Sequence, residues 1–266
     1  MSSTLKPYTN AFYDETTLIS VRSARQIVPL VLELLDIGSV VDVGCGSGSW
    51  LSVFAELGVP EVFGVDGPWV DPSNLLIARE NFFTHDLNRP LALDRRFDLV
   101  INLEVAEHLP AEQAESLVKS LTGLGPCVLF SAAVPFQGGT NHINEQWPEY
   151  WAQLFMKFGF QVIDCFRNRI WQDENVAYWF AQNLLLYVRE DVLSNNPRLL
   201  EYASATESNY LSRVHPKMFL KSREALSSPK TMVMRRVWNL LPRAARVRLL
   251  KYLTHHFWDQ VSARYS

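Results

Sequence analysis

The sequence predicts an α/β fold: a doubly wound, mostly parallel sheet of seven strands with an antiparallel last strand, followed by a basic helical C-terminal extension. Apolar segments of strand length alternate with amphipathic segments of helix length over the first half of the chain, which is typical of parallel sheets with crossover helices. A glycine-rich turn follows the first apolar run, at Gly44, Gly46 and Gly48. The end of the chain is rich in Lys and Arg.

The first predicted element is a helix over residues 18–35, where apolar residues recur at helical spacing before Gly38. A strand over 40–43 then leads into the glycines, and a helix over 49–57 follows them. The later elements alternate in the same way. Further strands are predicted at 61–65, 81–85, 97–103, 127–133, 161–166 and 177–188, and further helices at 111–121, 147–158 and 192–212.

The chain of 266 residues suits one domain over residues 1–190 and a helical extension over 191–266. Its net charge of −3 conceals an asymmetry between the two ends. Residues 1–211 hold 13 Lys and Arg against 26 Asp and Glu, a net −13, whereas residues 212–266 hold 12 against 2, a net +10. Such asymmetry indicates that the basic tail has a partner of its own.

The cysteines and the N-terminus favour a cytoplasmic protein. Cys45, Cys127 and Cys165 are scattered and form no C-x-x-C pair, as expected in a reducing compartment. The first ten residues lack the basic and apolar regions of a signal peptide, and no run of 18 apolar residues occurs.

The spacing of the glycines indicates the kind of cofactor. Gly48 follows Gly46 by two positions, whereas the dinucleotide fingerprint G-x-G-x-x-G needs three. Asp42 lies two positions before Gly44, and a fixed carboxylate there suits an ammonium or sulfonium ligand better than a phosphate. The loop therefore predicts S-adenosylmethionine (SAM) as the cofactor.

Three further motifs follow in order, at residues 62–66, 82–87 and 97–104. Together with the glycine loop, they resemble the Rossmann-like class I SAM-dependent methyltransferases over residues 38–135, and the likeness to a bacterial group of unassigned substrate continues to about residue 189. The resemblance implies that Asp66 accepts hydrogen bonds from the ribose hydroxyls and Asp86 from the adenine amino group. The whole predicted cofactor set comprises Asp42, Gly44, Gly46, Gly48, Asp66, Asp86, Leu87 and Glu104.

A segment with E-x-x-E-H spacing follows the fourth predicted strand, at the sheet edge where such folds bind ligands. In one interpretation His108 or His142, with Glu107, is catalytic and removes a proton from the acceptor. In a second, Glu104, Glu107, His108 and His142 bind a divalent metal ion: Mg, Mn, Fe or Zn. The spacing is similar to the metal-binding segments of small-RNA 2′-O-methyltransferases and ubiquinone-pathway O-methyltransferases. In a third, the segment only positions the cofactor and caps the next helix.

The predicted function is SAM-dependent methyl transfer to a hydroxyl or amine of a small molecule or glycan precursor. One alternative is an RNA methyltransferase that grips RNA with the basic tail, but the −13 body would repel phosphates and argues against a nucleic-acid partner. Another is a non-catalytic, cofactor-binding scaffold, against which the intact set of motifs argues.

The basic tail has two interpretations of its own. Basic residues interleaved with apolar ones suit a helix on an anionic membrane, which would place the enzyme peripherally at the inner membrane face. Alternatively, the tail docks on the acidic body or in a dimer interface.

Overall fold

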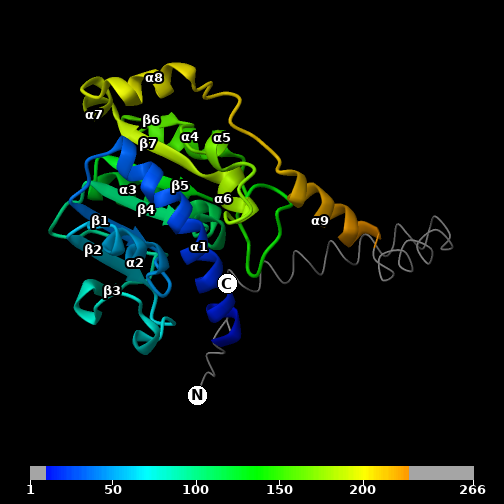
Figure 1. The fold of residues 1–266 in the computed structure, drawn as a ribbon, viewed down its shortest axis with the longest axis horizontal. Coiled ribbons are helices and arrows are strands. Elements are labelled where there is room, and N and C mark those ends of the chain that lie inside the picture. The colour runs from blue at the N-terminus through cyan, green and yellow to red at the C-terminus, as the bar shows by residue number, and fades with distance from the viewer. Residues whose placement is uncertain (1–9, 228–266) are drawn as a thin grey trace. The chain divides into compact units, whose positions relative to one another are not determined.

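The computed structural model describes residues 10–227, and the part up to Met218 forms one compact unit around a seven-stranded sheet (Figure 1). The strand order is β3-β2-β1-β4-β5-β7-β6. β7 pairs antiparallel with both β5 and β6, and all the other pairs are parallel. The predicted α/β fold, with its antiparallel last strand, is thus confirmed. The strands are β1 (Ser39–Val43), β2 (Glu61–Asp66), β3 (Phe82–Thr84), β4 (Leu99–Leu103), β5 (Cys127–Ser131), β6 (Phe160–Ile163) and β7 (Leu185–Arg189).

Helices cover both faces of the sheet (Figure 1). α1 (Asn10–Leu34) and α2 (Ser49–Glu56) pack on one face, and α3 (Ala114–Leu124) and α4 (Pro148–Met156) pack on the other. The remaining described helices are α5 (Arg167–Ile170), α6 (Tyr178–Asn183), α7 (Glu190–Ser194), α8 (Pro197–Ala205) and α9 (Pro216–Ser227), and the 3₁₀ turns are η1 (Pro72–Asn74), η2 (Arg79–Asn81), η3 (Ala106–His108) and η4 (Ala111–Gln113).

The central strands are apolar on both sides because both faces of the sheet are covered. In β5, Cys127 and Leu129 belong to the core beneath α1 and α2, whereas Val128 and Phe130 belong to the core beneath α3 and α4. Alternate residues of a strand point to opposite faces, so one continuous apolar run serves both cores. This rigid centre fixes the carboxyl ends of β1, β2 and β4, where the predicted site residues lie.

The predicted strand over residues 177–188 is wrong in its first half, because residues 178–183 form α6 and only the rest contributes to β7. A short apolar run fits a buried helix as well as a strand, so periodicity alone does not separate them. Tertiary contacts decide the outcome: the Phe180 ring packs edge-on against Trp50 of α2, with 5.2 Å between centroids.

The compact unit extends past residue 190, the predicted end of the methyltransferase domain, because Leu193 of α7 and Leu199 of α8 are buried in the core. The single helix predicted over 192–212 is instead α7 and α8. Asn196 separates them: its side chain accepts hydrogen bonds from the first backbone amides of α8, and Pro197 follows at the first helical position.

No helix within residues 10–227 is long and apolar enough to cross a bilayer. Most of the predicted basic tail, from residue 228 onward, and the first nine residues lie outside the described part of the chain. The predicted membrane contact of the tail therefore stays a prediction.

Arg167 is a fully buried cation that ties together the segments behind the candidate site. Its guanidinium donates two hydrogen bonds to the Asp164 carboxylate, at 3.0 and 2.8 Å, and further ones to the carbonyls of Gln182 and Leu211. Every partner is an acceptor, so the buried charge is fully compensated.

We expect Arg167→Ala to lower the free energy of unfolding by about 3–5 kcal/mol, because two buried carbonyls lose their donor and the buried Asp164 carboxylate keeps only its ion pair with Arg213. Denaturant unfolding measures the change. Arg169→Ala is the matched control: Arg169 pairs with Glu33 on the surface, and its loss should cost at most about 1 kcal/mol. Equal losses for the two variants would contradict the role of Arg167.

Candidate active site

The glycine loop after β1 adopts a backbone that side chains rarely tolerate. Gly44, Gly46 and Gly48 have φ values of 91°, 53° and 82°, in the left-handed region that favours glycine. A Cβ on Gly44 would also lie 2.4 Å from a methyl group of Val105. Val105 belongs to the E-x-x-E-H segment, so the absent side chain lets the two predicted motifs pack directly against each other.

Asp66, at the end of β2, faces this loop. Its two carboxylate oxygens accept hydrogen bonds from the backbone amides of Gly46 and Gly67, at 2.7 and 2.6 Å. Burial raises the pKa of Asp66, and these donors oppose the rise, as does a hydrogen bond from the Trp69 side chain. The Trp69 indole lies where a side chain at Gly67 would project, with a Cβ there only 2.2 Å from the ring.

Asp42 is the least compensated charge on this side of the site. It is 3% exposed in the middle of the sheet, and no described residue donates a hydrogen bond to its carboxylate. Burial, and secondarily the charge of Asp66, raises the pKa of Asp42 well above its usual range. A buried, unpartnered carboxylate beside an open glycine turn fits a cationic ligand, so these residues suit a sulfonium cofactor with an ammonium group.

Asp86 and Leu87 follow β3, and the backbone amide of His85 connects this segment to the carbonyl of Asp66 at 2.8 Å. Leu87 is buried, whereas the Asp86 side chain is 44% exposed. Asp86 accepts hydrogen bonds from the side-chain and backbone amides of Asn88, which hold the pKa of Asp86 below its usual value.

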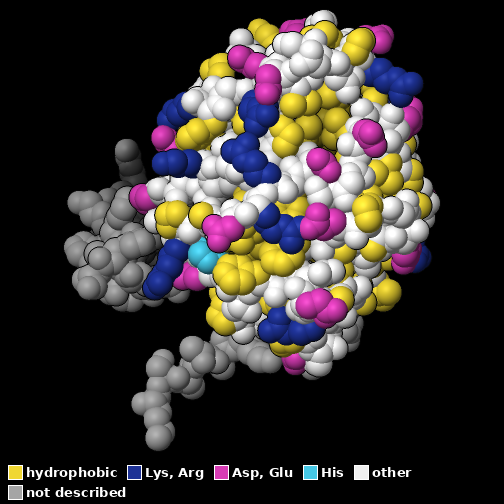
Figure 2. All heavy atoms as spheres, turned by 90° about the vertical axis from the view of Figure 1, so that its left-hand side faces the viewer, with side chains coloured by type: hydrophobic (Ala, Val, Ile, Leu, Met, Phe, Trp, Pro, Cys, Tyr) yellow, Lys and Arg dark blue, Asp and Glu magenta, His cyan; other side chains and the backbone are white. Residues whose placement is uncertain are grey.

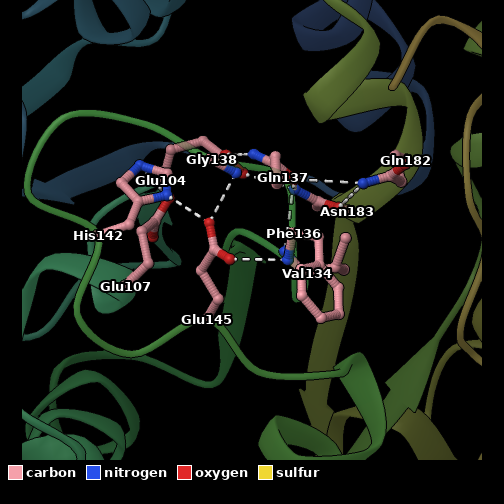
Figure 3. A network of polar contacts seen from close by, with 10 residues as sticks. All are labelled: Glu104, Glu107, Val134, Phe136, Gln137, Gly138, His142, Glu145, Gln182 and Asn183. Atoms are coloured by element: carbon pink, nitrogen blue, oxygen red, sulfur yellow. Dashed lines mark hydrogen bonds and ion pairs between the residues drawn. The ribbon is translucent and has the colours of Figure 1, made fainter. Parts of the chain in front are cut away.

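Glu104 ends β4 with a strained backbone, at φ 55°, and carboxamides hold its side chain (Figure 3). One oxygen accepts a hydrogen bond from Asn183 at 3.1 Å, and the other accepts one from Gln137 at 2.8 Å. The side-chain oxygen of Gln137 in turn accepts hydrogen bonds from the side-chain amides of Asn183 and Gln182, at 2.9 and 3.2 Å. Burial raises the pKa of Glu104, and the amide donors oppose the rise.

Glu107, His108 and His142 form a second cluster, next to Glu104. One ligand atom from each of the three lies within 4.8 Å of the others. Nε2 of His142 is 4.0 Å from Oε1 of Glu107, and the two imidazole rings meet edge to face, with 4.9 Å between centroids. Two ligands of one metal ion can be up to about 4.2 Å apart when each bond is about 2.1 Å. The Glu107–His142 pair, at 4.0 Å, meets this limit, and small side-chain movements would close the cluster of three, whose ligand atoms lie within 4.8 Å, around one ion.

The charge state of the cluster supports the same interpretation. Glu107 is fully buried, and within the described residues its carboxyl oxygens make no well-formed hydrogen bond, only weaker approaches to the backbone amides of Glu107 and Ala133 and to the Glu104 carboxyl. Burial, and next the charge of Glu104, raises the pKa of Glu107 well above its usual range. Burial and the neighbouring His142 lower the pKa of His108 to about 4, so this imidazole is neutral and able to bind a metal ion.

The structure therefore brings the predicted residues Glu104, Glu107, His108 and His142 together at the carboxyl edge of the sheet. Of these, Glu104 is held by amides and lies outside the group of three that could share one ion. Three carboxamides around Glu104 were not predicted from the sequence as site residues: Gln137, Gln182 and Asn183. Two adjacent carboxamides inside the apolar run 177–188 were the available signal, because buried amides need partners.

The comparisons with known proteins identify the family of the chain. A family model described as a methyltransferase domain matches residues 19–165, which is more than half of the chain. No curated protein matches the sequence significantly.

Three solved structures are similar to this chain. An O-methyltransferase family protein from Burkholderia thailandensis has a TM-score of 0.51 and 17% identity, over 69% of this chain and 61% of that one. Magnesium protoporphyrin IX methyltransferase from Synechocystis, with bound S-adenosylhomocysteine (SAH), has a TM-score of 0.48 and 22% identity, over 64% and 82%. The methyltransferase domain of bacterial CtHen1-C has a TM-score of 0.49 and 19% identity, over 64% and 98%.

The matching family model covers the glycine loop, the acid after β2 and the E-x-x-E-H segment, the motifs on which the sequence interpretation depended. The chain belongs to the methyltransferase-domain family and is a class I SAM-dependent methyltransferase.

Proposed function

We propose that this enzyme transfers a methyl group from SAM to a hydroxyl of a small molecule or glycan precursor, with a divalent metal ion held by Glu107, His108 and His142. The observation that carries the proposal is the Glu107 carboxyl, fully buried without a well-formed hydrogen bond among the described residues, 4.0 Å from Nε2 of His142 and beside the neutral imidazole of His108. A buried carboxyl whose pKa is raised in this way becomes a carboxylate when a cation lies close to it, which suits a metal ligand.

On the cofactor side, we assign binding to Asp42, the three loop glycines and Asp66, with Asp86 and Leu87 at the adenine end. When bound, SAM supplies a methyl group attached to a positive sulfur, which a nucleophile displaces in line. The protein contributes chiefly position. Asp66 would offer the lone pairs not used by Gly46 and Gly67 to the ribose hydroxyls, and Asp42 would compensate the positive charge.

On the acceptor side, a bound divalent ion lowers the pKa of a coordinated hydroxyl. Glu107 and the two imidazoles would hold the ion, and Glu104 would stay on its amides beside them. Val105 packs on Gly44, so the acceptor cluster adjoins the cofactor loop, as direct transfer requires.

The charge distribution favours a small acceptor over RNA. Residues 1–211 carry a net charge of −13, and the face in Figure 2 intersperses Lys and Arg with Asp and Glu around hydrophobic patches. On that face no continuous basic stripe follows the surface, and such a stripe is the usual electrostatic footprint of nucleic-acid binding.

We expect Asp66→Ala to weaken SAH binding at least about tenfold in calorimetry, since each hydrogen bond to a charged group contributes about 1.5–3 kcal/mol. Asp86→Ala is the comparison variant and should lose less, because the Asp86 side chain is 44% exposed. Unchanged binding in Asp66→Ala would overturn the ribose assignment.

We expect the protein, purified without chelators, to contain about one equivalent of a divalent metal ion by elemental analysis. Glu107→Gln and His108→Ala should lose the metal, because each removes a charged or neutral ligand. His85→Ala is the control and should retain it, since His85 bonds to the carbonyl of Arg89 and lies outside the cluster. A metal-free wild type that is fully active in EDTA would contradict the metal assignment.

The acceptor class can be tested with SAM carrying a radioactive methyl group and a cell extract separated into small-molecule, lipid and RNA fractions. We expect wild-type enzyme to label the small-molecule fraction or glycan-bearing lipids, and Glu107→Gln to label neither. Label confined to RNA would show that the proposed acceptor class is wrong.

A further inference from the structure

The Glu145 carboxylate contacts three other residues of the loop between β5 and α4. One of its oxygens accepts a hydrogen bond from the backbone amide of Phe136 at 2.8 Å. The other accepts one from the amide of Gly138 at 2.8 Å and lies 3.0 Å from Nδ1 of His142 (Figure 3). A single side chain, near the end of the loop, thus connects the turn at residues 136–138 to an imidazole of the proposed metal cluster.

The loop needs such contacts because its backbone is strained. Phe136 and Asn141 have φ values of 68° and 61°, which cost about 1–2 kcal/mol each in residues other than glycine. Besides Glu145, the carbonyl of Glu107 holds the loop by accepting from the amides of Ile143 and Asn144, at 2.9 and 3.1 Å. Two acids therefore set the shape of the loop, one through its side chain and one through its backbone.

Gly139 leaves room for the imidazole in this position. A Cβ on Gly139 would lie 2.2 Å from Nε2 of His142, so a side chain there would displace the ring. Glu145 therefore contacts one edge of the ring, at Nδ1, and Gly139 leaves space for the other edge, at Nε2.

The contact with Glu145 determines which nitrogen of His142 is free. A carboxylate only accepts hydrogen bonds, so the proton of a neutral His142 lies on Nδ1 when Glu145 is its partner. Nε2 then carries a lone pair and points toward Glu107, 4.0 Å away. A cation between these two atoms would be attracted by both. By contrast, Nδ1 of His108 is buried and has no hydrogen-bond partner in the described part of the chain.

We propose that Glu145 is a positioning residue that holds His142 as the Nδ1–H tautomer and keeps Nε2 available to the ion between His142 and Glu107. This inference rests on the proposed metal site. In general, an imidazole ligand donates its second N–H to a carboxylate or carbonyl, and removing that partner weakens metal binding about 10–100-fold.

The first test needs no metal. In metal-free, ¹⁵N-labelled protein, long-range nitrogen–proton NMR spectra report the tautomer of each neutral histidine, and His142→Gln identifies the His142 signals. We expect Nδ1–H in wild type and a shift toward Nε2–H in Glu145→Ala. Glu115→Gln, which alters an exposed carboxylate paired with Lys157, is the control and should resemble wild type. A loss of purely structural support would not select one tautomer.

The second test titrates Mn²⁺ or Zn²⁺ into the same proteins by calorimetry. We expect the affinity to fall about 10–100-fold in Glu145→Ala, with Glu145→Gln intermediate because its amide oxygen still accepts one hydrogen bond. SAH binding should stay unchanged in both variants, which shows that they are folded.

The outcomes separate the two proposals. An unchanged His142 tautomer and metal affinities within twofold of wild type in both Glu145 variants would overturn the role of Glu145. A wild type that binds neither ion would overturn the proposed metal site, while the tautomer spectra would still decide whether Glu145 orients His142. If Glu145→Ala fails to fold, Glu145→Gln carries both measurements.

Discussion

The physical constraint on which this site depends is negative charge buried at one edge of a sheet. Asp42, Asp66, Glu104 and Glu107 all lie in or just after strands β1, β2 and β4, and each has a pKa raised by burial. Desolvated carboxylates are costly unless donors or cations lie against them. The surrounding loops supply part of the donors that offset this cost.

The four acids are stabilised in two different ways. Asp66 and Glu104 are satisfied by the protein itself, through backbone amides of the glycine turn and through the carboxamides of Gln137 and Asn183. Asp42 receives no such donor from the described residues, and Glu107 has only weak approaches from backbone amides. This difference supports two roles: Asp66 and Glu104 fix the shape of the site, whereas Asp42 and Glu107 are proposed to lie against positively charged ligands. It also matches the proposed arrangement, with the sulfonium of the cofactor near Asp42 and the metal ion at Glu107.

The fold and the cofactor loop were predictable because their signals are local. Gly44, Gly46 and Gly48 sit where the backbone needs left-handed φ values, and β5 is a continuous apolar run because helices cover both faces. The amide network was not predictable in the same way, since Gln137 and Asn183 meet only when distant segments pack together. The same packing turns residues 178–183 into a helix despite their strand-like composition. Long-range contacts of this kind have no fixed spacing in a sequence.

The indole of Trp69 fills the space that Gly67 leaves open and donates a hydrogen bond to the carboxylate proposed for the ribose. A nucleoside that reaches Asp66 must compete with this indole or displace it, which changes the polarity around the ring. The fold thereby places a natural fluorophore beside the carboxylate proposed to bind the ribose, so binding of the cofactor is expected to change the emission of unlabelled protein. The chain holds eight tryptophans, so the signal of Trp69 is obtained as the difference between the wild type and Trp69→Phe. The rate of cofactor binding can then be followed by fluorescence.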